Sequence, residues 1–269
     1  MNRNLYRMEM KRNSLSLFLW TLVITLLISV TMSIYPTFIE NQSRIFGMLN
    51  LIPKGVLQFK GFSDLNDLLS PMGFYAANNV IYMMVLGSIY AIVLASGILL
   101  KEEYNKTAEY LLTRPITRSE IFLTKLAVVA GNVFLLNIIT SLAGFIATGL
   151  AGNEIIRLRP FLIISIYTFL LNMFFAATGL FISTLIKRSR PVTTFSIGLV
   201  LILYFIYTLS KISESVSKLG YLSPFTYVDQ KVVSPDYSLA PGNLAYFIGI
   251  SFLLIAISYR LYLHRDIYV

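Results

Sequence analysis

The feature that most constrains this chain is a series of six long apolar runs, separated by charged or proline-containing segments. The runs cover residues 15–35, 74–100, 121–150, 161–186, 191–210 and 244–263. A helix needs about 20 apolar residues to cross the roughly 30 Å hydrocarbon core of a bilayer, since it rises ~1.5 Å per residue. We therefore expect an all-α, polytopic membrane protein, in which residues 1–269 form one transmembrane domain with six transmembrane helices.

The basic residues predict how the chain is oriented. Arg3, Arg7 and Lys11 precede the first run at four-residue spacing, so one face of an N-terminal interfacial helix could lie against anionic headgroups. The segment lacks the small-residue cleavage site of a signal peptide, and we expect it to be retained. Lysine and arginine are concentrated on the side that holds both termini, which the positive-inside rule places in the cytosol. This topology explains the formal net charge of +9 without a nucleic-acid partner.

The longest charged interruption, residues 101–125, is named the bend. Thr107, Leu111 and Leu112 recur at one-turn spacing among charged residues, which predicts a short amphipathic helix. All charges of the bend, Lys125 included, are expected to lie in water. The apolar face of the short helix has no core of its own, so a partner protein or the headgroup surface would have to cover it.

The end of the bend carries the signals of a helix stop and a helix start. Pro115 ends the short helix, because proline has no amide hydrogen and disfavours helical geometry in the residue before it. Thr117 and Glu120 form a capping box, in which each side chain accepts a hydrogen bond from the other residue's backbone amide. A new helix should therefore begin at Arg118 and continue into the third apolar run.

Small and amide side chains inside the runs predict where the helices pack. Two sets repeat at four-residue spacing, as ridges that let another helix approach closely: Gly87, Ala91 and Ala95, and then Ala143, Ala147 and Ala151. Asn132 and Asn137 place amides within the third run. These amides must find hydrogen-bond partners, because the hydrocarbon core holds no water to satisfy them.

Several kinds of chemistry are missing from the sequence. The chain has no cysteine and one histidine, His264, so we expect neither a metal site nor a catalytic residue. No Gly-x-x-x-x-Gly-Lys-Ser/Thr phosphate cradle occurs, so we expect no ATP site of the usual kind. No run carries Asp, Glu or His in its middle third, which disfavours coupling to ions. An ion-coupled or passive carrier, and a non-transporting membrane scaffold, stay open as alternatives.

The sequence of the bend resembles that of a known family. Two glutamates, Glu102 and Glu103, then "KTAEYLLTRPITR" and a lysine are similar to the coupling region of ABC transporter permease subunits. The class is the type-two exporters, which handle drugs, peptides and polysaccharides. "YLSPFTYVD" resembles the segment between the last two spans of that class, where short helices dip back toward the membrane. The resemblance implies an export permease with a cytoplasmic coupling helix between the second and third spans.

The same resemblance implies partners and a location. Two copies of a cytosolic ATPase subunit would bind ATP and Mg²⁺ and dock on the bend, so the chain itself would bind no cofactor and would not be an enzyme. A second permease, identical or related, would complete the pore. The lipid environment would be the cell membrane of a bacterium, with the chain crossing it several times.

The resemblance also implies two sets of functional residues. ATPase docking is expected at Glu102, Glu103, Thr107, Glu109, Leu111, Leu112 and Arg114. A substrate path between the second and fifth spans is expected to include Asn78, Asn79, Tyr82, Met83, Thr193, Thr194, Tyr204 and Tyr207. A lining of this kind suits a hydrophobic or amphipathic cargo, such as a peptide, a drug or a lipid-like molecule.

Overall fold

The computed structural model describes residues 2–49, 65–104, 116–152, 156–186, 189–212 and 214–264, and the regular structure of these residues is helical. The long helices are α1 (Arg3–Ser33), α5 (Pro71–Tyr104), α7 (Arg118–Gly152), α8 (Leu158–Leu185), α9 (Ser189–Ile212) and α10 (Pro241–His264). The short ones are α2 (Tyr35–Glu40), α3 (Gln42–Leu49) and the 3-10 helices η1 (Leu65–Leu69), η2 (Glu214–Leu222) and η3 (Pro224–Tyr227). The expected all-α class is confirmed for these residues.

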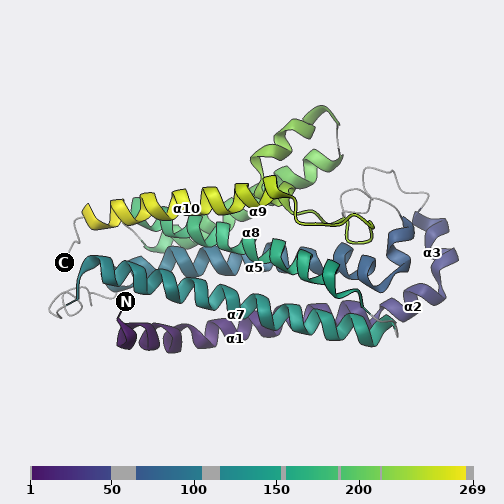
Figure 1. The fold of residues 1–269 in the computed structure, drawn as a ribbon, viewed down its shortest axis with the longest axis horizontal. Helices are drawn as coiled ribbons and strands as arrows, with labels where there is room; N and C mark the ends of the chain where they lie inside the picture. Colours follow the sequence, from purple (N-terminus) through teal and green to yellow (C-terminus); the bar gives the residue numbers. More distant parts are fainter. Residues whose placement is uncertain are drawn as a thin grey trace.

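Six of the helices are long and apolar enough to cross a membrane, as the sequence predicted. They run along the long direction of the molecule (Figure 1). α5 ends, α7 begins and α1 begins at one end of the bundle, which we name the bend end. The opposite end, where α2 and α3 lie and where α7 is followed by α8, is named the distal end.

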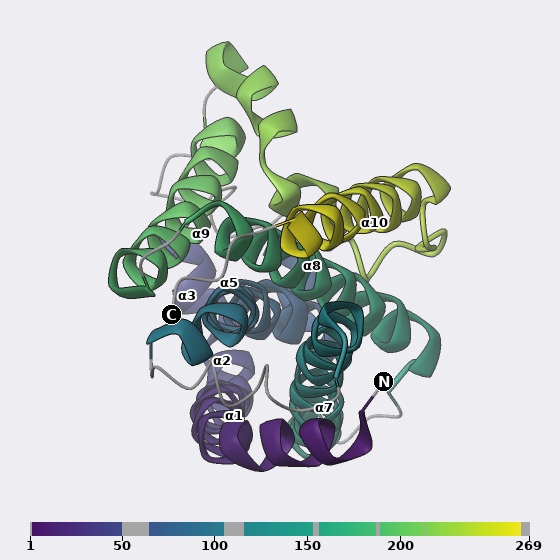
Figure 2. The ribbon, with the colours of Figure 1, turned by 90° about the vertical axis from the view of Figure 1, so that its left-hand side faces the viewer.

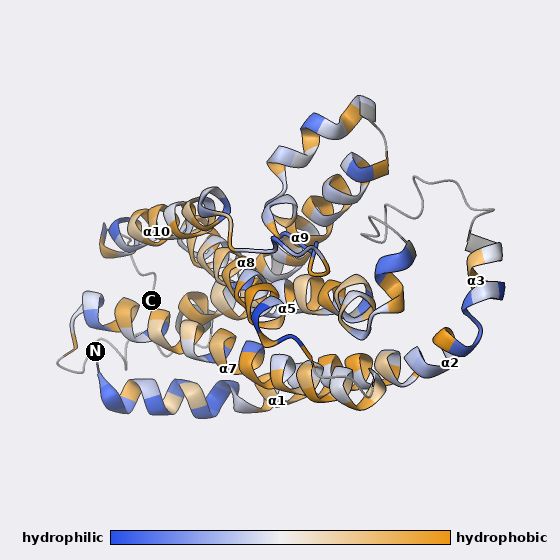
Figure 3. Ribbon diagram, turned by 45° about the vertical axis from the view of Figure 1, so that its right-hand side comes forward, coloured by the Kyte–Doolittle hydropathy of each residue, from blue (hydrophilic) through white to orange (hydrophobic). Residues whose placement is uncertain are grey.

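α5 lies at the centre of the bundle (Figure 2). It contacts α1, α7, α8 and α9, while α10 packs against α8 on the side away from α5. Most of α5 is accordingly buried, whereas most of α10 is exposed. The exposed helix surfaces are apolar along most of their length (Figure 3), which suits contact with lipid chains.

Small residues bring α5 and α8 into close contact. A methyl group added at Gly87 would lie 2.6 Å from the amide nitrogen of Asn172, and one added at Gly179 would lie 2.6 Å from the carbonyl oxygen of Ile92. Ala91 and Ala95 are fully buried in the same interface. The predicted ridge on the second run is therefore a helix-packing surface, because larger side chains would force the two backbones apart.

A chain of buried amides and a hydroxyl joins three helices near the middle of the bundle. Ser88 Oγ donates to Asn172 Oδ1 at 3.2 Å, and Asn172 Nδ2 donates to Asn137 Oδ1 at 3.3 Å, which links α5, α8 and α7. Tyr90 on α5 also donates to Asn132 Oδ1 at 3.3 Å. The partners expected for Asn132 and Asn137 are thus confirmed, on two different helices.

The second ridge has a different setting. Ala147 and its neighbours on the ridge are half-exposed on α7, where they face the end of α1 and the start of α2. Met32 and Pro36 lie across a pocket of about 560 Å³ from them. α7 packs extensively against α1, and beside the second ridge the two helices leave this pocket open between them.

Residues 214–240, named the α9–α10 connection, fold back against the long helices. Phe225 is fully buried, with its ring 5.4 Å from that of Tyr204 and 5.3 Å from that of Phe175. Ser223 Oγ donates to the carbonyl oxygen of Leu203 at 2.7 Å, well inside α9. The "LSPF" sequence thus packs its phenylalanine between α8 and α9, which anchors the connection to the bundle.

Replacing Asn172 with leucine tests the central polar chain. The change keeps a side chain of similar size but removes the hydrogen-bond partner of the Ser88 hydroxyl and of the Asn137 side-chain carbonyl. We expect the free energy of unfolding in mixed micelles to fall by about 1–2 kcal/mol, the size of one or two interhelical hydrogen bonds.

The matched control is Asn78→Leu, because the Asn78 amide donates to Phe74 O of its own helix at 3.0 Å. This variant should unfold close to wild type in the same denaturant titration. Equal losses for the two variants would contradict a special role for the polar chain.

Candidate functional site

The described part of the chain contains the two ends of the bend but not its middle. Glu102 and Glu103 belong to the last turn of α5, which continues to Tyr104, and their side chains lie outside the described residues. The remaining docking residues expected from the sequence also lie outside: Thr107, Glu109, Leu111, Leu112 and Arg114. Their predicted role stays a prediction, and the described residues bear on how the bend is anchored.

The predicted capping box at the start of α7 is confirmed. The Glu120 amide donates to Thr117 Oγ1 at 3.2 Å, and the Thr117 amide donates to Glu120 Oε2 at 3.2 Å. α7 begins at Arg118, as the sequence predicted. The chain therefore re-enters the bundle from the bend at a defined residue.

Lys125 corrects one expectation, because it does not lie in water. Its side chain is 1% exposed, and its ammonium nitrogen donates to the carbonyl oxygen of Ile98 on α5 at 2.5 Å. Lys125 lies one turn after the buried Ile121, so the helical period turns it toward α5 and away from solvent. This carbonyl oxygen, about two turns before the end of α5, stabilises the buried ammonium group through the hydrogen bond.

The start of α7 also contacts the end of α10. Arg118 Nη1 donates to the carbonyl oxygen of Leu263 at 3.2 Å, and the Tyr259 hydroxyl donates to Ser119 Oγ at 3.0 Å. The ring of Phe122 packs 5.4 Å from that of Tyr259 and 5.6 Å from that of Tyr262. These contacts attach the last turns of α10 to the first turns of α7.

The first turns of α1 complete this cluster. The Asn2 backbone amide donates to Thr124 Oγ1 at 3.0 Å. The Tyr6 hydroxyl packs over Gly131 of α7, where a methyl group added to the glycine would lie 3.1 Å from it. Residues 118–125 are therefore contacted by α1, α5 and α10 together. We name this cluster the brace.

The N-terminal turns of α1 have one basic face and one buried face. Arg3, Arg7 and Lys11 are exposed, as expected from their spacing. Glu9 is fully buried on the opposite face, where its Oε1 pairs with Arg12 Nη2 at 2.7 Å. These turns run across the end of the bundle before α1 turns along it (Figure 2), and they are its most hydrophilic part (Figure 3).

α5 has one face that the other helices leave partly open. The half-exposed residues follow the helical period along it, and we name them the α5 stripe: Asn78, Ile81, Tyr82, Val85, Leu86, Ile89, Val93 and Gly97. α1 and α9 flank this side of α5 (Figure 2). The Thr31 hydroxyl of α1 donates to the Tyr82 hydroxyl at 3.4 Å, so one edge of the stripe is held by α1.

The residues expected to line the path are divided between this stripe and the protein interior. Asn78 and Tyr82 are on the stripe, and Thr193 and Thr194 are exposed on α9. Met83 is buried on another face of α5, and the side chain of Asn79 lies outside the described residues. Val85 and Ile89 also lie on the stripe but were not predicted as path residues, although their four-residue spacing from Ile81 is a sequence signal for this face.

Tyr204 and Tyr207 contact the α9–α10 connection. Tyr204 packs on Phe225, and the buried Tyr207 hydroxyl accepts from Gln230 Nε2 at 3.4 Å. Gln230 also lies 3.2 Å from the Met84 sulfur of α5. These two tyrosines therefore help to fix the connection over the distal ends of α5 and α9.

The connection also holds a buried tyrosine. The Tyr237 hydroxyl donates to the carbonyl oxygen of Asp229 at 2.7 Å. Burial, and to a smaller extent the Asp229 carboxylate, raise the pKa of Tyr237 above its ordinary value, so the hydroxyl stays protonated and able to donate.

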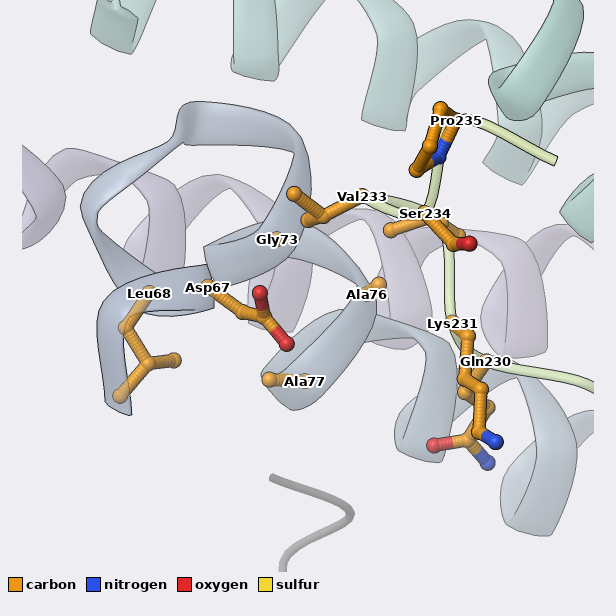
Figure 4. Close-up of a pocket in the computed structure, with 11 residues that line it drawn as sticks. Asp67, Leu68, Gly73, Ala76, Ala77, Gln230, Lys231, Val233, Ser234 and Pro235 are labelled. Atoms are coloured by element: carbon orange, nitrogen blue, oxygen red, sulfur yellow. The ribbon is translucent and has the colours of Figure 1, made fainter. Parts of the chain in front are cut away.

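A pocket of about 410 Å³ lies at the distal end, between η1, the start of α5 and residues 230–235 (Figure 4). Asp67 and Lys231 bring opposite charges to it from different segments, and Ala76 and Ala77 form an apolar wall. Within the described ranges, no group of three or more His, Cys, Asp or Glu side chains could hold a metal ion. The pocket thus offers a small, mixed surface beside the distal end of the stripe.

Comparison with known proteins identifies the family. Residues 3–267 match the family described as ABC-2 family transporter protein, which includes all six apolar helices, the bend and the α9–α10 connection. No curated protein matches the chain in sequence. The match confirms the family that the bend resembles. The chain therefore belongs to the ABC-2 family of transporters, as a multi-pass membrane component.

Proposed function

We propose that this chain is the permease subunit of an ATP-driven exporter. Two permeases, identical or related, form the translocation path, and two cytosolic ATPase subunits bind ATP and Mg²⁺ and dock on the bends. The observation that carries the proposal is the family match over residues 3–267, because membrane components of this family generally work with a separate ATPase. Export, rather than import, comes from the resemblance of the bend to export permeases.

The contacts at the brace support a mechanical role for the bend. The bend leaves α5 and returns to α7, and the Lys125–Ile98 hydrogen bond ties these two helices together close to it. A displacement of the docked bend would therefore move the ends of α5 and α7 as one unit. The contacts of Arg118 with α10 and of Asn2 with α7 extend the same unit to α10 and α1.

The α5 stripe supports the position of the path. α5 is central and would move with the brace. Among the described residues, the partly open face of α5 lies between α1 and α9. A second permease that faces this side would enclose a path between the two α5 helices. Val85, Leu86 and Ile89 give that path apolar walls, which suits a hydrophobic or amphipathic cargo.

The proposed orientation places the bend end in the cytosol of a bacterial cell. Arg3, Arg7 and Lys11 are exposed at this end, where they would meet the anionic lipids of the inner leaflet. The first turns of α1 would then lie along the membrane surface as an interfacial helix.

Leu112→Asp tests docking on the bend. A carboxylate in the apolar face of the coupling helix would have to be buried against the ATPase without a partner charge. We expect the amount of ATPase subunit that co-purifies from native membranes to fall by at least about tenfold, as for the loss of one interface hot spot.

Leu219→Asp is the matched control, because Leu219 is an exposed leucine on η2 at the distal end. It should retain the ATPase. If the wild-type chain purifies as a six-helix protein with no ATPase, the permease proposal fails, and a carrier or a scaffold becomes the leading function.

Lys125→Met tests the brace separately from docking. Methionine keeps the apolar part of the side chain but loses the hydrogen bond to Ile98 O. We expect the ATPase to co-purify normally, while the stimulation of its activity by cargo falls about tenfold, within the range of a 1–3 kcal/mol coupling free energy.

The control for this variant is Lys211→Met, which removes an exposed lysine from the opposite end of the bundle. Thermal unfolding in detergent separates loss of coupling from loss of the fold. Cargo stimulation at the wild-type level in a stably folded Lys125→Met protein would contradict a coupling role for this contact.

Single cysteine substitutions test the position of the second permease. The chain has no cysteine of its own, so any disulfide-linked dimer must form through the introduced residue. Val85→Cys, on the α5 stripe, should give dimers in oxidised native membranes. Ile248→Cys, on the exposed face of α10, should not, and the reverse pattern would place the second permease on α10 instead.

A further inference from the structure

A long apolar groove lies on the outer surface of α7 and α8, away from the α5 stripe. It has a volume of about 490 Å³ and is open along one side. Leu142 on α7 and Leu158 and Leu162 on α8 form its exposed rims, and Phe161 is buried at its base. None of the residues that line it carries a charge.

Two of the three polar side chains that line the groove, Asn137 and Ser165, are already hydrogen-bonded within the helices. Asn137 donates to Val133 O at 2.9 Å and accepts from Asn172 at 3.3 Å, and Ser165 Oγ donates to Phe161 O at 2.8 Å. A ligand in the groove would therefore meet an apolar surface. Hydrocarbon fits this surface better than a ligand that needs hydrogen bonds.

The groove is as deep as one leaflet of a bilayer. From Leu158 to Phe169 α8 rises about 16 Å, and half of the hydrocarbon core is about 15 Å. The deep end is closed by the rings of Phe134 and Phe169, which pack edge to face at 5.9 Å. A cargo path would have to continue to the bend end, whereas this groove stops at mid-membrane.

The mouth of the groove carries positive charge. Arg157 and Arg159 are exposed on either side of the rim residue Leu158, at the start of α8, and Arg157 also borders a second pocket beside Pro71. Arg159 precedes Leu162 by three positions and Ile166 by seven, so it lies on the helix face that borders the groove. The first amides of α8 have no side-chain cap from Arg157, and the N-terminal end of the helix dipole adds to the positive potential there.

We propose that this groove binds one acyl chain of an anionic glycerophospholipid from the distal leaflet, with the lipid phosphate held by Arg159, Arg157 and the start of α8. The charge at the mouth selects the headgroup, and the leaflet-deep apolar wall holds the chain. α7 and α8 touch through their aromatic rings at 5.9 Å near the deep end and through Phe145 and Phe161 at 5.3 Å near the mouth. The lipid chain would fill the space between these two contacts.

Native mass spectrometry of the purified chain tests this site without a requirement for ATPase or transport. The protein is reconstituted in nanodiscs with equal amounts of phosphatidylglycerol and phosphatidylcholine of identical acyl chains, and the lipids retained per protomer are counted. Wild type should retain phosphatidylglycerol at least about fivefold over phosphatidylcholine, as expected for cations beside an anionic headgroup. Equal retention of the two lipids would overturn the proposal.

Two variants separate the headgroup from the acyl chain. Arg157→Gln with Arg159→Gln should lower the amount of phosphatidylglycerol retained per protomer, while Arg44→Gln with Lys218→Gln, which removes two exposed cations elsewhere, should leave it at the wild-type level. Leu162→Trp should fill the groove and reduce retention of both lipids. Retention at the wild-type level in either groove variant would overturn the site.

One property of the variants and one further measurement keep the result decisive. Both arginines are exposed, so their variant remains informative even if the groove-filling variant fails to fold. Leu142→Cys in the cysteine-free chain reports on a protein occupant. Disulfide-linked dimers through this position would show that a second copy covers the groove, and would overturn the lipid assignment in favour of that copy.

Discussion

Close approach between α5 and α8 is the constraint on which the rest of the structure depends. Gly87 makes room for the Asn172 amide, and Gly179 lets its helix approach the backbone of α5. In lipid, apolar side chains gain little from leaving the solvent, so such close packing and buried hydrogen bonds carry the association of helices. The Ser88–Asn172–Asn137 chain then fixes α7 to the same pair. Three helices are thus held in register at the centre of the bundle.

This central packing decides which surfaces remain for function. α8 and α7 cover two sides of α5, and α1 and α9 border the face that carries the stripe. At the bend end, Lys125 links α7 to α5 and Arg118 links α7 to α10, each through a backbone carbonyl oxygen. The part of the chain proposed to receive force from an ATPase and the part proposed to line the path therefore belong to one helix, α5, braced at its end.

The sequence predicted the features that depend on local pattern. Run length predicted the six helices, and Thr117 and Glu120 predicted the first residue of α7. Glycine and alanine spacing predicted the face of α5 that packs closely, but not that α8 is the helix packed on it. It was wrong for Lys125, because a charge at the edge of a bend can be turned inward by the helical period. The sequence could only partly separate path residues from buried ones. Met83 and Val85 are both apolar, and they differ only in the direction they face around α5. Burial around a central helix is a tertiary property that one sequence does not encode locally.

The first turns of α1 and its apolar stretch form one continuous hydrogen-bonded helix, Arg3–Ser33. Its apolar stretch adjusts to the local bilayer by tilting, and thinner or thicker membranes demand different tilts. Because the same helix ends in the Asn2 contact with Thr124, any change of tilt also pulls on the start of α7. A change of membrane thickness that tilted α1 would in this way reach the residues that anchor the bend.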